Sequence, residues 1–176
     1  CEADVYLIAV PTPFKKTKNK IPEPDLSFVF EAARSIAPYL NKNNLLIIES
    51  TCPIGATEKI FELVSEISNL DSSEINMAYC PERVLPGNIL YELQHNDRVI
   101  GGISSLSSKL AKTFYTQFCF GELIITDSKT AEMVKLSENS FRDVNIAYAN
   151  ELSMLCDNLD VNVHELISIA NRHPRV

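Results

Sequence analysis

The 176-residue sequence contains no tryptophan, three histidines and five glycines, and none of the glycines forms a Gly-x-Gly-x-x-Gly pattern beside a strand. The turn that places a dinucleotide pyrophosphate on a helix N-terminus is therefore missing from these residues. The five cysteines are widely spaced, without a Cys-x-x-Cys pair. This spacing argues against a disulfide framework and a zinc site, so we predict no metal.

Basic charge and long apolar runs are also scarce. The formal net charge is -7, the pI is about 5.0, and the one lysine-rich stretch is 15–20. This balance argues against a nucleic-acid surface. No apolar run approaches the roughly 20 residues that cross a bilayer, and no signal-peptide pattern is present. We expect a globular cytoplasmic protein with no nucleic-acid or membrane partner.

Apolar residues make up 45% of the sequence and fall into short runs between helical patterns. Strands are predicted at 5–10, 45–48, 75–79, 99–100 and 123–126, helices near 28–40, 57–67 and 105–118, and a polar loop at 14–24. Alternating strands and helices imply right-handed crossovers. The predicted fold class is therefore α/β, with a parallel, doubly wound sheet.

Beyond Asp127 the pattern is helical only, with a long helix over 131–151 and a shorter one over 162–170. We therefore divide the chain into a sheet domain, 1–127, and the start of a helical domain, 128–176.

The long helix carries a polar stripe. Lys135, Asn139 and Arg142 are spaced to share one narrow face, with Glu132 nearby. An apolar arc expected to face a core lies roughly opposite, and it comprises Met133, Leu136, Val144 and Ala147. The stripe either faces water or forms one wall of a site.

Polar residues also follow three predicted strands. Thr12, Thr51 and Glu82 each come shortly after an apolar run. Each alone could be a helix cap or a turn former. Ligands of doubly wound sheets bind at the carboxyl ends of strands, so three such residues favour a site. Cys80 lies close enough to Glu82 to be a candidate nucleophile, although no histidine is adjacent in sequence.

Six segments resemble the UDP-glucose/GDP-mannose dehydrogenase family in order and spacing, from end to end of the chain. They are ADVYLIAVPTP, ESTCPIGATE, YCPERVLPGN, RVIGG, AEMVKLSENSFRDVNIAYANE and ANRHPRV. The resemblance implies the second half of a Rossmann-like NAD-binding domain, followed by the long helix of an all-α central region. Family members dimerise through that region, which implies a homodimer through 131–158.

The resemblance also implies an activity, the oxidation of a UDP-sugar at C6 in two NAD-dependent steps. Thr12 and Thr51 match positions along the nicotinamide side of NAD. Lys135 matches the catalytic lysine, which acts on the oxygen at C6 as a proton carrier or oxyanion stabiliser. Asn139 matches an asparagine that donates to that oxygen, and Glu82 matches a glutamate associated with thioester hydrolysis. The substrate-binding positions of the family match Arg83, Val84, Arg142, His173 and Arg175. Without the resemblance, Glu82 and Arg83 could be a simple ion pair and His173 a surface histidine.

Two features of the family pattern are not found. The glycine fingerprint is absent, and so is the glycine-rich loop that holds the nucleophilic cysteine and precedes a UDP-binding domain. We therefore expect an internal piece of a longer enzyme that is inactive by itself. Two alternatives remain open: a sister enzyme acting on another UDP-sugar, and a non-catalytic module that dimerises through the long helix.

Overall fold

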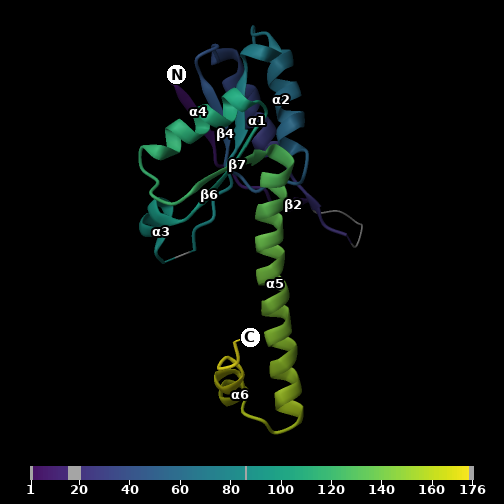
Figure 1. Cartoon of the computed structure of the whole chain (residues 1–176). Coiled ribbons are helices and arrows are strands. Elements are labelled where there is room, and N and C mark those ends of the chain that lie inside the picture. The colour runs from purple at the N-terminus through teal and green to yellow at the C-terminus, as the bar shows by residue number, and fades with distance from the viewer. Residues whose placement is uncertain (1, 16–20, 86, 175–176) are drawn as a thin grey trace. The chain divides into compact units, whose positions relative to one another are not determined.

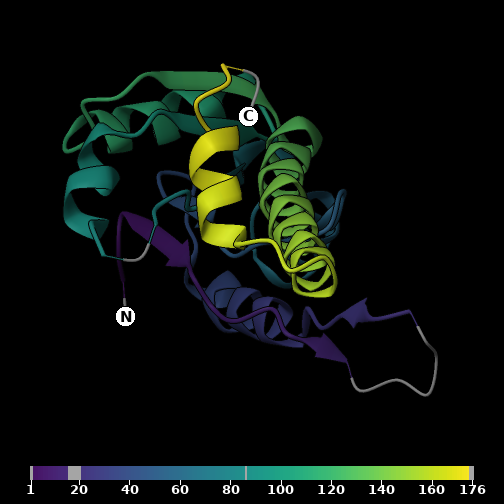
Figure 2. The same ribbon diagram turned by 90° about the horizontal axis from the view of Figure 1, so that it is seen from below.

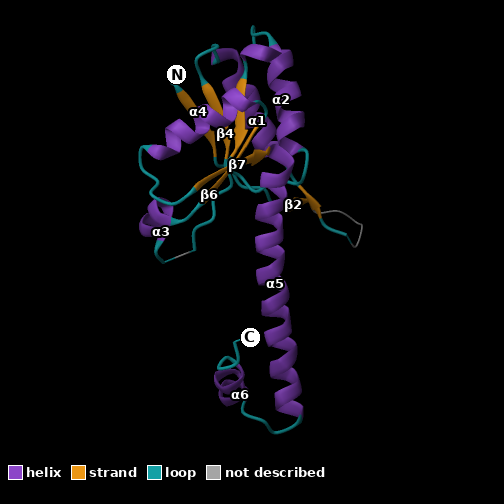
Figure 3. Cartoon of the chain, in the orientation of Figure 1, coloured by secondary structure: helices purple, strands orange, loops and turns teal. Residues whose placement is uncertain are grey.

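The computed structural model describes residues 2–15, 21–85 and 87–174 (Figure 1). A five-stranded sheet has the order β1-β4-β5-β6-β7. Its strands are β1 (Val5–Ile8), β4 (Leu45–Ile48), β5 (Asn76–Tyr79), β6 (Arg98–Gly102) and β7 (Leu123–Asp127). The helices are α1 (Ser27–Ile36), α2 (Ala56–Ile67), α3 (Ile89–His95), α4 (Ser105–Thr116), α5 (Ser128–Asn158) and α6 (Val163–Ala170), with short 3-10 turns η1 (Ala37–Tyr39) and η2 (Ser72–Glu74) (Figure 3).

The sheet is mostly parallel, as predicted, but it contains one antiparallel pair. β1, β4 and β5 run parallel, and so do β6 and β7, whereas β5 and β6 are antiparallel, with Tyr79 opposite Gly101. The prediction of a wholly parallel sheet was wrong at this junction. After β5 the chain continues to the short helix α3. It then enters β6 at the end of the sheet where β5 stops. The start of β6 therefore lies at the carboxyl end of β5.

Helices cover both faces of the sheet because the strand residues alternate between two cores. Leu46, Ile48, Met77 and Tyr79 point to one core, which also contains residues of α1, α2 and the start of α5. The other core pairs the intervening strand residues with Ala111 and Tyr115 of α4. α2 and α4 accordingly lie on either side of the strands (Figure 1). This is the doubly wound arrangement that the sequence predicted.

Gly101 allows α5 to begin directly against the sheet. A Cβ atom at this position would lie 2.6 Å from the main-chain oxygen of Asp127 and 2.8 Å from the Cβ of Ala131. Only glycine fits such close packing of backbone on backbone. The first turns of α5 are therefore fixed on β6.

Three segments of the chain differ from the sequence prediction. The segment expected as a polar loop contains two short paired strands, β2 (Phe14–Lys15) and β3 (Glu23–Pro24) (Figure 2). α3 was not predicted, because seven residues between two turns carry little periodicity. α5 extends beyond the predicted helix at both ends. No helix among the described residues is long and apolar enough to cross a membrane.

The chain forms two compact units, Cys1–Leu136 and Ser137–Val176, and the boundary between them falls inside α5. In the second unit, α6 lies beside the last turns of α5 (Figures 1 and 2). Asp160 adopts a left-handed conformation with φ of 55° at the turn between them. The side chain of Asn162 then caps α6 by accepting from the backbone N–H groups of His164 and Glu165, at 3.0 and 3.2 Å.

Candidate functional site

The carboxyl ends of β1, β4 and β5 form one edge of the sheet, and the predicted residues of the first unit follow them. Ile8 is paired with Ile48, and Ile48 with Tyr79, so Thr12, Thr51 and Glu82 leave the sheet at the same edge. Thr12 and Thr51 are half-buried. Register alone therefore brings three loops together here.

Ser50 joins the loops that carry the two threonines. Its hydroxyl accepts from the N–H of Val10 and donates to the carbonyl of Val10, both at 2.8 Å. The chain just before Thr12 is thus held beside the chain just before Thr51. The sequence prediction missed this serine, because a Ser in a polar loop has no distinguishing local pattern.

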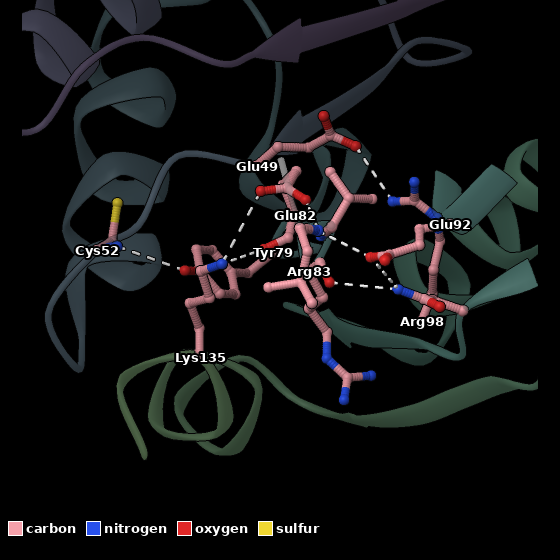
Figure 4. A network of polar contacts seen from close by, with 11 residues as sticks. Glu49, Cys52, Tyr79, Glu82, Arg83, Glu92, Arg98 and Lys135 are labelled. Carbon is pink, nitrogen blue, oxygen red and sulfur yellow. Dashed lines mark hydrogen bonds and ion pairs between the residues drawn. The ribbon is translucent and has the colours of Figure 1, made fainter. Parts of the chain in front are cut away.

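Lys135 extends from α5 to the loop that follows β5 (Figure 4). Its ammonium group donates to the main-chain carbonyl of Glu82 and lies 4.0 Å from Glu82 Oε2. The Lys135 side chain is only 13% exposed, whereas that of Glu82 is 43% exposed. Two residues that are 53 positions apart in sequence, one cationic and one anionic, therefore meet at the sheet edge.

Residues 82–85, which follow β5, are held by hydrogen bonds within this segment, to α3 and to the residue before β6. Glu82 Oε1 accepts from the N–H of Val84, and Arg83 donates from Nη1 to the carbonyl of Asp97 at 2.7 Å. From α3, Glu92 accepts from the N–H of Leu85 at 2.8 Å. The predicted substrate residues Arg83 and Val84 are therefore held by hydrogen bonds on both sides of the segment 82–85.

Glu132 is a buried acid that the sequence prediction placed only near the polar stripe. It is 0% exposed, and its carboxylate accepts from the N–H groups of Gly55 and Thr57 and from the Thr57 hydroxyl. These groups form the N-terminus of α2, which has no side-chain cap of its own. A helix start without a Ser, Thr, Asp or Asn cap was the available sign that a cap comes from elsewhere.

A second buried charge, Arg98, lies at the start of β6. Arg98 Nη1 is 3.5 Å from Glu49 Oε1, the same oxygen that accepts from the Tyr115 hydroxyl at 2.6 Å. The guanidinium also stacks on the Tyr115 ring, 4.4 Å from its centroid. These three residues were not predicted, since they come together only through the antiparallel junction of β5 and β6.

Cys80 faces this charged cluster from within the core and is 1% exposed. Burial, and then the carboxylate of Glu49, raise the pKa of its thiol far above the ordinary value. A nucleophilic cysteine needs the opposite shift. The structure therefore supports a packing role for Cys80 over a catalytic one.

The remaining predicted residues belong to the second unit. Asn139 is half-buried, His173 is exposed, and Arg142 is exposed with Nε 3.9 Å from Asp143 Oδ1. Arg175 lies outside the described residues. The predicted core arc of α5 was wrong, because Met133 is 50% and Val144 67% exposed, whereas Glu132 on the polar side is buried. Periodicity identified the two faces of this helix but not which of them faces the interior.

Among the described residues, no group of His, Cys, Asp and Glu could hold a metal ion. The edge does suit one half of a dinucleotide. It offers the hydroxyls of Thr12 and Thr51 and the ammonium of Lys135, while the first amides of α2 are already bound by Glu132. Because those amides are occupied, they do not bind a pyrophosphate. The residues present therefore fit the nicotinamide side.

A mostly parallel sheet with helices on both faces and polar residues at its carboxyl edge defines a Rossmann-like nucleotide-binding protein. Residues 1–119 match the NAD-binding domain of the UDP-glucose/GDP-mannose dehydrogenase family, and residues 129–176 match the central domain of that family. The chain belongs to the UDP-glucose/GDP-mannose dehydrogenase family. The predicted family, fold class and cofactor, NAD, are thereby confirmed.

Individual relatives agree with this assignment. The chain is 55% identical to UDP-N-acetyl-D-mannosamine dehydrogenase of Escherichia coli, over 99% of this chain and 43% of that protein. It is 54% identical to NDP-N-acetyl-D-galactosaminuronic acid dehydrogenase of Ralstonia nicotianae, over 99% of this chain and 42% of that protein. The solved structure of UDP-D-ManNAc dehydrogenase from Pyrococcus horikoshii superimposes with a TM-score of 0.92, at 44% identity, over 99% of this chain and 41% of that one. The chain thus spans about two fifths of the length of these relatives.

Proposed function

We propose that this chain is part of a nucleotide-sugar 6-dehydrogenase that oxidises UDP-N-acetyl-D-mannosamine to UDP-N-acetyl-D-mannosaminuronate with two NAD. The observation that carries the proposal is the meeting of Lys135 and Glu82 at the edge that Thr12 and Thr51 share. The similarity to the E. coli UDP-N-acetyl-D-mannosamine dehydrogenase supports the choice of sugar. The product would be a uronic acid for surface polysaccharides such as enterobacterial common antigen.

Lys135 is the proposed proton carrier and oxyanion stabiliser. A compact ammonium group mounted on a helix is a preorganised donor for an oxygen that gains charge at C6. Asn139, one helical turn further on, is proposed to donate to the same oxygen. Glu82 is exposed enough to activate a water in the hydrolytic half of the reaction. In this proposal Lys135 and Asn139 act on the substrate oxygen, and Glu82 acts on the water.

Thr12 and Thr51 are proposed to orient the cofactor. NAD supplies the hydride acceptor, and the two hydroxyls, on loops joined through Ser50, would contact its nicotinamide side. Such an enzyme acts where NAD and nucleotide sugars are present, which places it in the cytoplasm in this proposal.

The proposed substrate contacts are Arg83, Val84, Arg142, His173 and Arg175. Guanidinium groups suit a diphosphate because they present two parallel donors to its oxygens. The hydrogen bonds that hold residues 82–85 support the assignment of Arg83 and Val84.

Assembly is a further part of the proposal. Six large apolar side chains on the second-unit segment of α5 are more than half exposed: Phe141, Val144, Ile146, Tyr148, Met154 and Leu155. Exposed apolar clusters of this kind mark interaction surfaces. We propose that a second copy covers them in a homodimer through 131–158, and a chain that dimerises without binding NAD would be the non-catalytic module of the alternative hypothesis.

The choice of sugar is tested with the complete enzyme that contains this chain. NADH formation is measured with UDP-N-acetylmannosamine, UDP-N-acetylglucosamine and UDP-glucose, and we expect two NADH per molecule of the first sugar. Faster turnover of either other sugar would favour a sister dehydrogenase. A nucleotide-linked N-acetylgalactosamine should be tested as a fourth substrate, because the R. nicotianae relative is nearly as similar to this chain. The 176 residues alone are expected not to reduce NAD.

A further inference from the structure

Glu132 carries a feature that helix capping alone does not require. Its carboxylate receives hydrogen bonds from Gly55 N at 2.6 Å, Thr57 N at 2.8 Å and Thr57 Oγ1 at 2.6 Å. A serine or aspartate at the N-cap would satisfy the same amides locally, without burying a charge brought from 75 residues away. Capping of α2 alone therefore does not explain why a buried glutamate from α5 occupies this position.

The reason lies in what Glu132 connects. On one side it binds the start of α2, which directly follows the loop that carries Thr51. On the other side it lies on α5 three residues before Lys135, about one turn of the same helix. One buried carboxylate thus joins the segment that carries the proposed cofactor residue to the helix that carries the proposed proton carrier.

The surroundings make this connection rigid. Thr57 is fully buried, and the N–H of Cys52 lies 3.4 Å from the Tyr79 hydroxyl, which ties the same loop to the end of β5. Burial first, and then the charge of Glu132, raise the pKa of Cys52 to about 12. The field of the Glu132 carboxylate therefore extends into the loop after β4.

We propose that Glu132 is a positioning residue that fixes Lys135 relative to the loop carrying Thr51. Lys135 then has two constraints, its own bond to the Glu82 carbonyl and the anchoring of its helix one turn earlier. A proton carrier must be held within a fraction of an ångström of its productive position. The inference rests on the proposed function only in the role it gives Lys135.

The first test uses the complete enzyme with Glu132→Gln. The amide keeps one acceptor oxygen and replaces the other with an NH2 group, which cannot accept from the backbone N–H that faces it. We expect kcat per folded molecule to fall roughly 10- to 100-fold with little change in KM for the sugar, and the pH profile of kcat to shift. Unchanged kcat and pH profile, with only a lower Tm, would show a purely structural role and overturn the proposal.

Thr57 provides a matched pair of variants. Thr57→Val removes the hydroxyl donor to Glu132 and should lower kcat, whereas Thr57→Ser keeps it and should restore nearly normal turnover. The Glu132→Gln/Thr57→Val double variant should be little slower than Glu132→Gln alone, because both changes break one contact. Additive losses would contradict this coupling. Glu58→Gln, which alters an exposed neighbour paired with Lys129, serves as the control.

A second test does not depend on turnover. In the 176-residue chain, competitive acetylation followed by mass spectrometry reports the reactivity of each lysine amine. Glu132→Gln should raise the labelling of Lys135 several-fold relative to the exposed Lys112, while Glu58→Gln should not. Equal labelling with and without Glu132 would overturn the proposal. If the complete enzyme reduced NAD with none of the sugars, the proposed function would fail, and the labelling result would still decide the role of Glu132.

Discussion

The two units of the chain treat polar side chains in opposite ways, although one helix runs through both. In the first unit, Glu132 is fully buried and the Lys135 side chain is 13% exposed, while Met133 is half exposed. In the second unit, Arg142 lies in solvent, and so does Phe141 beside it, which is 73% exposed. The same helix therefore borders the proposed site in one unit and exposes apolar and charged side chains in the other.

This difference shows what determines the meaning of a polar stripe. Burying a charge is costly unless partners satisfy it, and the first unit supplies them through the start of α2 and the carbonyl of Glu82. The described residues of the second unit give Arg142 only a distant carboxylate on its neighbour, Asp143. Partner groups from distant segments, not the periodicity itself, turn a helix face into a site.

The largest expected effect comes from the buried cation of the first unit. Lys135→Met in the complete enzyme should lower kcat about 10³-fold, because it removes the proton carrier from the proposed site. Lys129→Met, which changes an exposed lysine on the same helix, should leave kcat within about twofold. Turnover measured by NADH formation distinguishes the two variants. If both variants lowered kcat equally, the proposed catalytic role of the buried lysine would be contradicted.

Two arginines extend the comparison to stability. Arg98→Leu leaves Glu49 without its cation in a largely buried place, and we expect a loss of about 3–5 kcal/mol in the free energy of unfolding. Urea denaturation of the chain, followed by circular dichroism, measures this loss. The control is Arg34→Leu, because the exposed Arg34–Glu31 pair at 4.0 Å should contribute about 0–1 kcal/mol. If Arg98→Leu lost less stability than Arg34→Leu, the buried pair of Arg98 and Glu49 would not stabilise the fold.

The buried thiol of Cys52 makes the stability of the first unit depend on pH. Its folded-state pKa is about 12, against 9.0 for an ordinary thiol, so the contribution is fully present below pH 9.0 and disappears as pH rises toward 12. We expect the chain to lose roughly 1 kcal/mol over the first pH unit above 9.0, and Cys52→Ala to lose less over the same interval. Thermal unfolding between pH 8 and pH 10 checks this. Identical slopes for both proteins would contradict the prediction.

The sequence was a good guide to the fold and to the placement of three residues at one edge of the sheet. Short apolar runs indicated five strands of the main sheet, and their ends correctly placed Thr12, Thr51 and Glu82 at one edge. Glu132 and Arg98 were missed, because their partners are supplied by segments 75 and 49 positions away. Whether such residues come together depends on the order of the strands and on the antiparallel pairing of β5 with β6. No local sequence pattern predicts either.

The smallest expected effect belongs to the second unit. Arg142→Ala should change the free energy of unfolding of this chain by no more than about 0.5 kcal/mol, because the side chain is exposed and its contact with Asp143 is long. Urea denaturation beside Arg98→Leu measures the difference directly. In the complete enzyme, the same variant should raise KM for the UDP-sugar if Arg142 contacts the diphosphate. A neutral stability change together with a raised KM would show that α5 carries function in both units, through a buried charge in the first and an exposed one in the second.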